Sequence, residues 1–214
     1  KGQKRTNPVT LKNLSYTIFA FVCFLIGSLY LTLVGFFVLT IGGRSEKHNN
    51  IYHRQLQWVC RFVLFRIPMT KCEIKNDSGE EDPFNKPAIM ICNHQSHIDL
   101  MAVLALSHKV IVVTNKWVWN APFYRWIIRY ADFYPAEKFD AGDIEPLRKK
   151  IQEGYSIAIF PEGTRSEDCS ILRFHKGAFY LAKELNVSII PIMIHGFGYV
   201  LPKKDMLLKK GELR

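Results

Sequence analysis

Hydrophobic residues are unevenly distributed along the chain, and their spacing changes near residue 45. The stretch Leu14–Ile41 contains 28 residues, mostly Phe, Leu, Ile and Val, and none of them is charged. After residue 87, short apolar runs alternate with segments whose apolar residues recur at helical spacing. The pattern predicts a membrane-associated helical segment in residues 1–45. It also predicts an α/β domain in residues 46–214, which we expect to be incomplete at its C-terminus.

The apolar stretch is longer than one straight membrane crossing requires. As a single helix it would extend about 42 Å, compared with about 30 Å for the hydrocarbon core of a bilayer. It would therefore form one tilted span, or two short helices that bend at Gly27-Ser28 and return through the same leaflet. Basic residues lie on both sides of it: Lys1, Lys4, Arg5 and Lys12 before, and Arg44, Lys47, Arg54 and Arg61 after. Positive charge marks the cytoplasmic side, so we expect a membrane-embedded helical hairpin with both ends there.

Beyond this stretch, predicted helices alternate with predicted strands. Glu46–Phe65 has the spacing of an amphipathic helix, which would lie on the membrane interface, pack on the core, or do both. Residues 76–87 contain Asp, Ser, Gly and two Pro, and predict a loop. Further helices are predicted at Ile98–Leu106, Ala121–Tyr130, Ile144–Glu153 and Ala178–Leu185, and strands at Ala88–Cys92, Val110–Thr114, Phe133–Tyr134, Ser156–Phe160 and Val187–Ile194. This alternation is typical of an α/β fold with a central mixed, largely parallel sheet flanked by helices.

The net charge of +10 is concentrated around the apolar stretch. Residues 1–66 contain nine Lys or Arg and one acidic residue, whereas residues 67–214 contain twenty and eighteen. Anionic headgroups attract juxtamembrane basic residues by about 1 kcal/mol each, so the distribution favours a phospholipid bilayer as partner. It does not favour nucleic acid, because no stacking motif or zinc spacing accompanies the charge.

Cysteine usage indicates neither a disulfide framework nor a metal site. The chain contains five scattered cysteines, and no CxxC pair or zinc-ligand spacing occurs among them. An odd number of scattered cysteines is typical of buried free thiols in a reducing compartment. We therefore expect no bound metal.

Candidate chemistry begins at Asn93–Asp99, which reads Asn-His-Gln-Ser-His-Ile-Asp and follows directly on a predicted strand. Ligand sites of α/β sheets lie at the carboxyl ends of strands. If the next helix begins near His97, His94 and Asp99 meet across the turn, and Asp99 can orient His94 as a general base. His97 is a rival base. Taken alone, this spacing is more typical of a structural loop histidine and a carboxylate at a helix start.

A second motif, Phe160–Ser166, reads Phe-Pro-Glu-Gly-Thr-Arg-Ser and also follows a predicted strand. Gly163 would let the backbone approach a ligand, and Arg165 has the donor fork that suits phosphate or carboxylate. The alternative is an ordinary Pro-Glu-Gly turn. Candidate substrate-binding residues here are Glu162, which would bind a hydroxyl or organise the loop, together with Gly163, Thr164, Arg165 and the later Lys176.

The two motifs together resemble the glycerolipid acyltransferases of the lysophosphatidic acid acyltransferase (1-acylglycerol-3-phosphate O-acyltransferase) type. That family is characterised by NHxxxxD and FPEGTRS, and the chain matches both. The resemblance covers about residues 85–196 and includes Lys176-Gly177-Ala178 and Ile190-Pro191-Ile192. The chain departs from the family pattern at one element. The Gly and the phosphate-binding Arg that the family has around residues 131–138 are both absent. Lys138 is the candidate substitute for that arginine.

The resemblance implies a membrane-bound O-acyltransferase of phospholipid biosynthesis. It would move a fatty acyl group from acyl-CoA or acyl carrier protein, as co-substrate, to a lysophospholipid hydroxyl. The expected reaction converts 1-acyl-glycerol-3-phosphate to phosphatidic acid, with His94 and Asp99 as the catalytic residues and neither cofactor nor metal. The family's two-helix membrane motif also implies the hairpin. The implied location is a membrane, with the active site on the cytoplasmic face of a bacterial inner membrane or its equivalent.

Other functions remain open at this point. One alternative is an acyltransferase for another lipid or lysolipid acceptor, since the phosphate-binding arginine is missing from its usual place. A hydrolase would use the same base to activate water, although the nucleophile-elbow pattern GxSxG is absent. A nonenzymatic membrane-anchored lipid-binding module would need no base at all, so replacing His94 distinguishes it from an enzyme.

Overall fold

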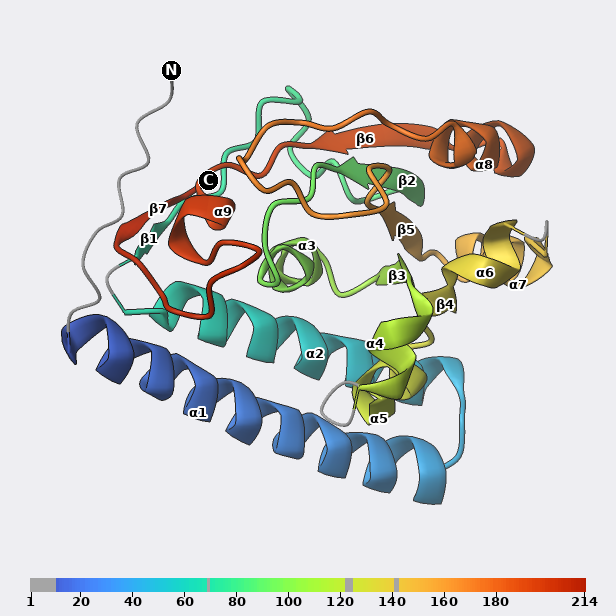
Figure 1. The fold of residues 1–214 in the computed structure, drawn as a ribbon. Helices are drawn as coiled ribbons and strands as arrows, with labels where there is room; N and C mark the ends of the chain where they lie inside the picture. The colour runs from blue at the N-terminus through green and yellow to red at the C-terminus, as the bar shows by residue number, and fades with distance from the viewer. Residues whose placement is uncertain (1–10, 69, 122–124, 141–142) are drawn as a thin grey trace.

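A long apolar helix and its antiparallel partner lie beneath an α/β domain (Figure 1). The computed structural model of the chain describes residues 11–68, 70–121, 125–140 and 143–214, so Lys1, Lys4 and Arg5 lie outside the described residues. Helix α1 (Leu11–Gly35) continues into a π-helical segment, η1 (Phe36–Ile41), and helix α2 (Glu46–Arg66) returns along it.

Parallel strands form the centre of the domain. Within the described residues, one sheet has the order β4-β3-β5-β2-β6, and every pairing in it is parallel. A second, two-stranded sheet pairs β1 with β7, also in parallel. The strands are β1 (Thr70–Cys72), β2 (Ala88–Cys92), β3 (Val110–Thr114), β4 (Tyr134–Pro135), β5 (Ser156–Ile159), β6 (Ser188–Ile192) and β7 (Gly211–Leu213).

The helices that follow α2 are mostly short. They are α3 (Asp99–Leu106), α4 (Lys116–Asn120), α5 (Arg125–Tyr130), α6 (Ala136–Asp140), α7 (Glu145–Gln152), α8 (Gly177–Leu185) and α9 (Phe197–Val200). The α/β prediction with a largely parallel sheet is confirmed, and β2 and β3 have the predicted bounds. The sequence analysis did not predict α4, α6, α9 or the β1-β7 pair. These are elements of three to five residues, too short for a period to be visible.

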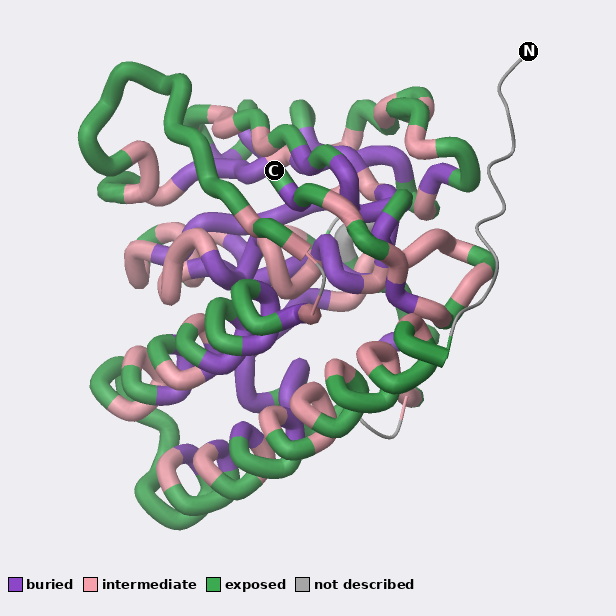
Figure 2. Tube along the Cα trace, turned by 90° about the vertical axis from the view of Figure 1, so that its left-hand side faces the viewer, coloured by how far each residue is buried: buried purple, intermediate pink, exposed green. Residues whose placement is uncertain are grey.

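Alternating side chains on the central strands divide the core into two layers. Ile89, Ile111 and Ile157 lie side by side in register and pack with α7 and α8. Their neighbours Met90, Val112 and Ala158 point to the other face and pack with α2 and α3. Figure 2 shows the buried strands between the more exposed helices. Both faces are covered, which is why the strands are apolar throughout instead of alternating.

The predicted bend at Gly27-Ser28 is wrong. Both residues lie inside α1, and helix runs without interruption from Leu11 to Ile41. A β-carbon on Gly27 would lie 2.8 Å from Val59 Cγ1, so this glycine permits close packing of α1 on α2. Within the described residues, Leu11–Ile41 is one helix long and apolar enough to cross a membrane, judged by length and composition. The helical pair is therefore made by α1–η1 and α2, instead of by two halves of the apolar stretch.

Helix α2 is apolar on two faces, as its sequence suggested. Ser45 caps its first turn by accepting a hydrogen bond from the His48 N–H. One face is buried in the core: Tyr52, His53, Leu56, Val59, Cys60, Val63 and Leu64. The other face leaves large side chains exposed, namely Ile51, Trp58, Phe62 and Phe65. Packing on the core and an exposed apolar surface thus coexist on one helix.

Buried His53 should make the stability of the fold depend on pH. Its ring is 2% exposed and lies edge-on to Tyr155, 4.9 Å between centroids. Burial lowers the pKa of His53 to about 4, against opposition from Asp132, while Lys150, His108 and Arg44 add to the lowering. The unfolded chain therefore binds this proton more readily, so stability is complete above about pH 6.5 and falls as pH drops towards 4.

Replacing His53 by Phe should remove the part of the pH dependence of stability that His53 causes. Between pH 7 and pH 4.5, the free energy of unfolding of the parent protein should fall by as much as about 3 kcal/mol more than that of His53→Phe. Urea unfolding in detergent micelles, followed by circular dichroism, measures both values. An equal pH dependence in the two proteins would show that His53 does not carry it.

Candidate active site

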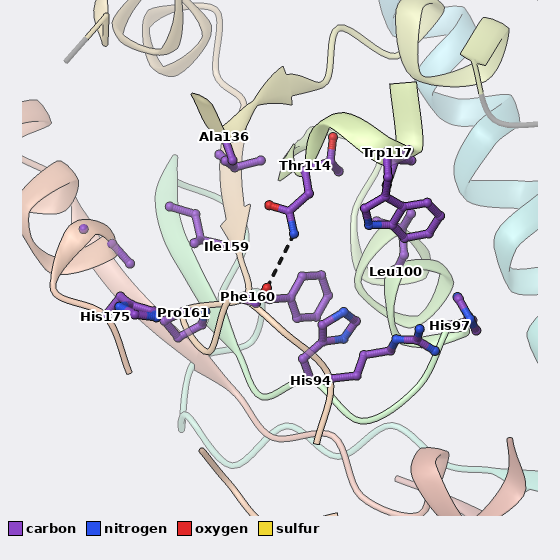
Figure 3. A pocket seen from close by; sticks show the side chains of 17 residues that line it. His94, His97, Leu100, Thr114, Trp117, Ala136, Ile159, Phe160, Pro161 and His175 are labelled. Carbon is purple, nitrogen blue, oxygen red and sulfur yellow. Dashed lines mark hydrogen bonds between the residues drawn. The ribbon is translucent and has the colours of Figure 1, made fainter. Parts of the chain in front are cut away.

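A cavity of about 410 Å³ lies at the carboxyl ends of β2, β3 and β5. This is the edge of a parallel sheet at which ligands bind in α/β folds. Figure 3 shows the side chains converging on it from the loops that follow these strands. The lining residues used below are His94, His97, Asn115, Trp117, Gly163, Arg165 and His175, and the apolar wall includes Leu100, Val113, Val118, Ile159 and Phe160.

His94 and Asp99 meet across the turn between β2 and α3, as predicted. His94 Nδ1 lies 2.8 Å from Asp99 Oδ2. An ionised carboxylate can only accept hydrogen bonds, so we assign the proton to Nδ1 and the lone pair to Nε2. The imidazole stacks on the Phe160 ring, 4.3 Å between centroids, which limits its rotation (Figure 3). The His94 ring is thus held in one orientation at the cavity wall.

The loop before α3 is folded around the Asp99 carboxylate. Asp99 is fully buried, and its Oδ2 also accepts hydrogen bonds from the backbone N–H groups of Gln95 (2.5 Å) and Ser96 (2.7 Å). Those two N–H groups belong to the loop that precedes α3. Asn93 anchors the same loop to the end of β6, because its side-chain amide donates to the Ile194 carbonyl and accepts from the Ile194 N–H. The Asp99 carboxylate is therefore held by the backbone of its own loop, and Asn93 holds that loop against the chain after β6.

The two sequence motifs are joined through the backbone of His94. Glu162 Oε1 accepts from the His94 N–H at 2.9 Å, and the Ser166 N–H donates to the His94 carbonyl at 2.8 Å. The other carboxylate oxygen of Glu162 accepts from the Leu172 N–H at 3.0 Å. Glu162 is 4% exposed and does not line the cavity. Of its two predicted roles, these contacts match organising the loop.

Arg165 and Gly163 bring the second motif to the cavity wall. The Arg165 side chain lines the cavity together with His94 and His97. Gly163 has φ +68°, a conformation that other residues rarely adopt, and this turn exposes the backbone of the motif to the cavity. Asn115, which follows β3, donates to the Gly163 carbonyl at 3.4 Å (Figure 3). A guanidinium beside an imidazole is an arrangement suited to an anionic ligand with a nearby hydroxyl.

His97 lines the cavity but lacks the contacts of a base. Its ring lies edge-on to Trp117, 6.3 Å between centroids, and its orientation differs from that of His94 (Figure 3). Burial lowers the pKa of His97, and the nearby Arg165 and His94 side chains lower it further, against an opposing effect of Asp99. Of the two histidines, it is His94 that contacts Asp99.

Three candidate residues lie away from the cavity wall. Thr164 is exposed, and its hydroxyl accepts from the Lys203 ammonium. Lys176 is exposed at the start of α8, although its neighbours His175 and Gly177 line the cavity. Lys138 lies in α6 and is exposed, whereas Ala136 at the start of that helix reaches the cavity. The structure thus gathers His94, Asp99, Gly163 and Arg165, and leaves the two candidate lysines outside the lining.

Sequence reasoning did not identify Asn115, Trp117 or His175 as site residues. Asn115 and Trp117 follow the predicted strand Val110–Thr114, so the strand end was the available signal. His175 directly precedes the Lys176-Gly177 pair, and its N–H donates to the Pro161 carbonyl at 2.8 Å. Among the described residues, no group of three or more His, Cys, Asp or Glu is arranged to hold a metal ion.

Comparison with known proteins defines the class of this site. The family model described as "Acyltransferase" matches residues 71–195, which is more than half of the chain and contains both motifs. The chain therefore belongs to the acyltransferase family.

Particular relatives are named as acyltransferases of one lysophospholipid. The chain is 29% identical over 133 residues to a chloroplastic 1-acyl-sn-glycerol-3-phosphate acyltransferase of Arabidopsis thaliana, covering 60% of this chain and 37% of that protein. It is 30% identical over 166 residues to the 1-acyl-sn-glycerol-3-phosphate acyltransferase of Saccharomyces cerevisiae, covering 72% and 54%. The alpha form of that enzyme from Homo sapiens is 24% identical over 190 residues, covering 86% and 65%. The chain thus spans about two fifths of the length of the plant relative.

A solved structure has the same fold. The 1-acyl-sn-glycerophosphate (LPA) acyltransferase PlsC from Thermotoga maritima superposes with a TM-score of 0.75, covering 95% of this chain and 83% of that chain. The two sequences are 24% identical. The likeness extends over nearly the whole chain, so it includes the helical pair as well as the sheet.

Proposed function

We propose that the chain transfers a fatty acyl group from an acyl thioester to the free hydroxyl of 1-acylglycerol-3-phosphate, forming phosphatidic acid. The observation that carries this proposal is the His94–Asp99 pair in a cavity that Arg165 also lines. The relatives from Arabidopsis, yeast and human are named for this acceptor, which has both a hydroxyl and a phosphate. The thioester would be carried by CoA or by acyl carrier protein.

The reaction needs one base that later returns the proton. His94 Nε2 takes the proton of the acceptor hydroxyl as the oxygen attacks the thioester carbonyl. The new C–O bond forms, the C–S bond breaks, and the imidazolium protonates the departing thiolate, so the products are an ester and a thiol. Asp99 keeps Nδ1 protonated and stabilises the imidazolium while it exists. Glu162 and Ser166 act by positioning, because they bind the His94 backbone.

Arg165 would bind the acceptor phosphate through its guanidinium. Replacing Arg165 by Ala should raise the KM for lysophosphatidic acid by about 10- to 100-fold, the effect of losing a hydrogen bond to a charged group. The KM for the acyl donor should change less than twofold. Arg173→Ala is the matched control, because Arg173 is exposed and does not line the cavity. An unchanged acceptor KM in Arg165→Ala would assign Arg165 to the donor or to the fold.

The helical pair would hold the enzyme in one leaflet of the membrane. Side chains of α1 and η1 that are more than half exposed include Leu11, Ile18, Ile26, Leu29 and Phe37. The helix packs along α2 and α5 and lies flat on the domain, which supports insertion of the helical pair into one leaflet. Arg61 and Arg66 stack on the exposed Phe65 and Phe62 of α2, a combination that suits the headgroup region. A lipid acceptor would then reach the cavity laterally, from the cytoplasmic leaflet.

Product analysis tests the proposed function directly. Membranes containing the full chain are incubated with an isotopically labelled acyl-CoA, or acyl carrier protein thioester, and one lysolipid at a time. The panel holds lysophosphatidic acid, lysophosphatidylcholine and monoacylglycerol. We expect labelled phosphatidic acid by mass spectrometry, at a rate well above that of the other products.

Each alternative function gives a different product. Labelled free fatty acid without acylated lipid would identify a hydrolase. Preferred acylation of lysophosphatidylcholine or monoacylglycerol would show that the acceptor is that lipid and not lysophosphatidic acid. Lysolipid binding without turnover of either thioester would identify a lipid-binding module.

A further inference from the structure

The segment Leu201–Leu208 connects the apolar helix to both motifs. The Leu201 carbonyl accepts a hydrogen bond from the Ser96 hydroxyl at 2.8 Å, beside the His94 loop. The Leu208 N–H donates to the Thr17 hydroxyl of α1 at 2.9 Å. This segment lies beyond residue 195, where the match to the family model ends. The two sequence motifs therefore do not include it.

Lys203 makes the contact between this segment and the second motif. Its ammonium donates to the Thr164 hydroxyl at 3.2 Å and to the Arg165 carbonyl at 2.8 Å. The side chain is partly buried, whereas Thr164 is exposed. A single cation thus connects two successive residues of the loop that brings Arg165 to the cavity. Hydrogen bonds from a charged donor are stronger than those between neutral groups.

We propose that Lys203 is a positioning residue that holds the Thr164 hydroxyl and the Arg165 carbonyl so that the Arg165 side chain is placed to bind the acceptor phosphate. This inference rests on the proposed function and deepens it by naming a determinant of acceptor specificity. Lys203 does not line the cavity, so it acts through Arg165 and not on the substrate. The sequence offered Lys138 and Lys176 as additional cations, but the cation that contacts the motif is Lys203.

Lys204 provides a matched control on the same segment. Its ammonium pairs with the Glu167 carboxylate at 2.6 Å, and both side chains are more than half exposed. It has the same charge and lies near the same loop, but no hydrogen bond joins it to the Thr164 or Arg165 backbone. An effect of Lys203 that depends on long-range charge alone would appear equally in Lys204→Met.

The kinetic test is a double-mutant cycle in the active full chain. Lys203→Met should raise the KM for lysophosphatidic acid about tenfold, with the donor KM and kcat within twofold. Lys203→Arg should recover most of that loss, and Lys204→Met should behave as the parent protein. In the Arg165→Ala background, Lys203→Met should add less than a further twofold, because residues that act through one another are not additive.

Amide hydrogen exchange tests positioning independently of activity. Peptides spanning Gly163–Ser166 should exchange faster in Lys203→Met than in the parent protein, and Lys204→Met should leave them unchanged. If the parent protein transfers no acyl group, the proposed function fails while the exchange result still decides whether Lys203 holds the loop. Unchanged exchange, an unchanged acceptor KM, or full additivity with Arg165→Ala would each overturn the inference. If Lys203→Met fails to fold, Lys203→Gln, which retains one donor group, is measured in its place.

Discussion

Replacing His94 by Ala should lower kcat by about 10²–10⁴, the usual contribution of a positioned general base. The reason is geometric, since Nδ1 is bound to Asp99 and Nε2 is the nitrogen left to accept the proton of the acceptor. The variant should fold, because the hydrogen bonds that join His94 to Glu162 and Ser166 use its backbone atoms. Steady-state acyl transfer to lysophosphatidic acid measures the effect, and circular dichroism checks the fold.

His97→Ala is the control for this experiment. His97 lines the same cavity and has the same ring, but its ring packs edge-on to Trp117. We expect kcat of His97→Ala to remain within about tenfold of the parent value, a small loss on the scale of a general base. A large loss of kcat in His97→Ala combined with a small loss in His94→Ala would make His97 the base instead of His94. Full activity in both variants would exclude His94 and His97 as the base.

Asp99→Asn should lower kcat by about 10³–10⁴, the scale seen when an imidazole loses its orienting carboxylate. Asp99 Oδ2 accepts hydrogen bonds from the His94 ring and from the backbone N–H groups of Gln95 and Ser96. An amide presents one acceptor oxygen and one NH₂ group in place of two acceptor oxygens. If the NH₂ faces Nδ1, the imidazole must carry its proton on Nε2 and can no longer act as a base.

The double variant shows whether Asp99 works through His94. His94→Ala with Asp99→Asn should be no slower than His94→Ala alone, because residues that act as a unit are not additive. Asp99 is fully buried, so thermal unfolding of each variant is measured beside kcat. If the loss in kcat of the double variant equals the product of the two single losses, Asp99 contributes by a route separate from His94.

Strands and amphipathic helices could be predicted because their signal is local. The apolar run Ala88–Cys92 needs only its own composition to be identified as a buried strand, and α2 shows its period within its own sequence. The bend at Gly27-Ser28 was wrong because a glycine in a helix has two physical explanations. It permits a kink, or it lets another helix approach closely. The contact with Val59 shows that Gly27 serves close helix packing. Val59 is 32 positions away, so no local pattern contains that information.

The pairing of His94 with Asp99 was predictable because five residues around one turn bring both to a strand end. The role of Glu162 was left open, since its two partners, the His94 and Leu172 N–H groups, come from separate loops. Asn115 and Lys203 were missed for the same reason. Their partners lie 48 and 38 residues away in the chain, and only the sheet brings the loops together.

The sequence by itself determined the α/β class, the pairing of His94 with Asp99, and the apolar character of the N-terminal helical segment. These depend on composition, period and the contacts of one turn. The tertiary structure alone decided that the apolar stretch is a continuous helix paired with α2, and that Glu162 supports the His94 loop. It also decided which lysine contacts the Arg165 carbonyl. Long-range hydrogen bonds and close helix packing have no local signature, because the partners become neighbours only after the chain has folded.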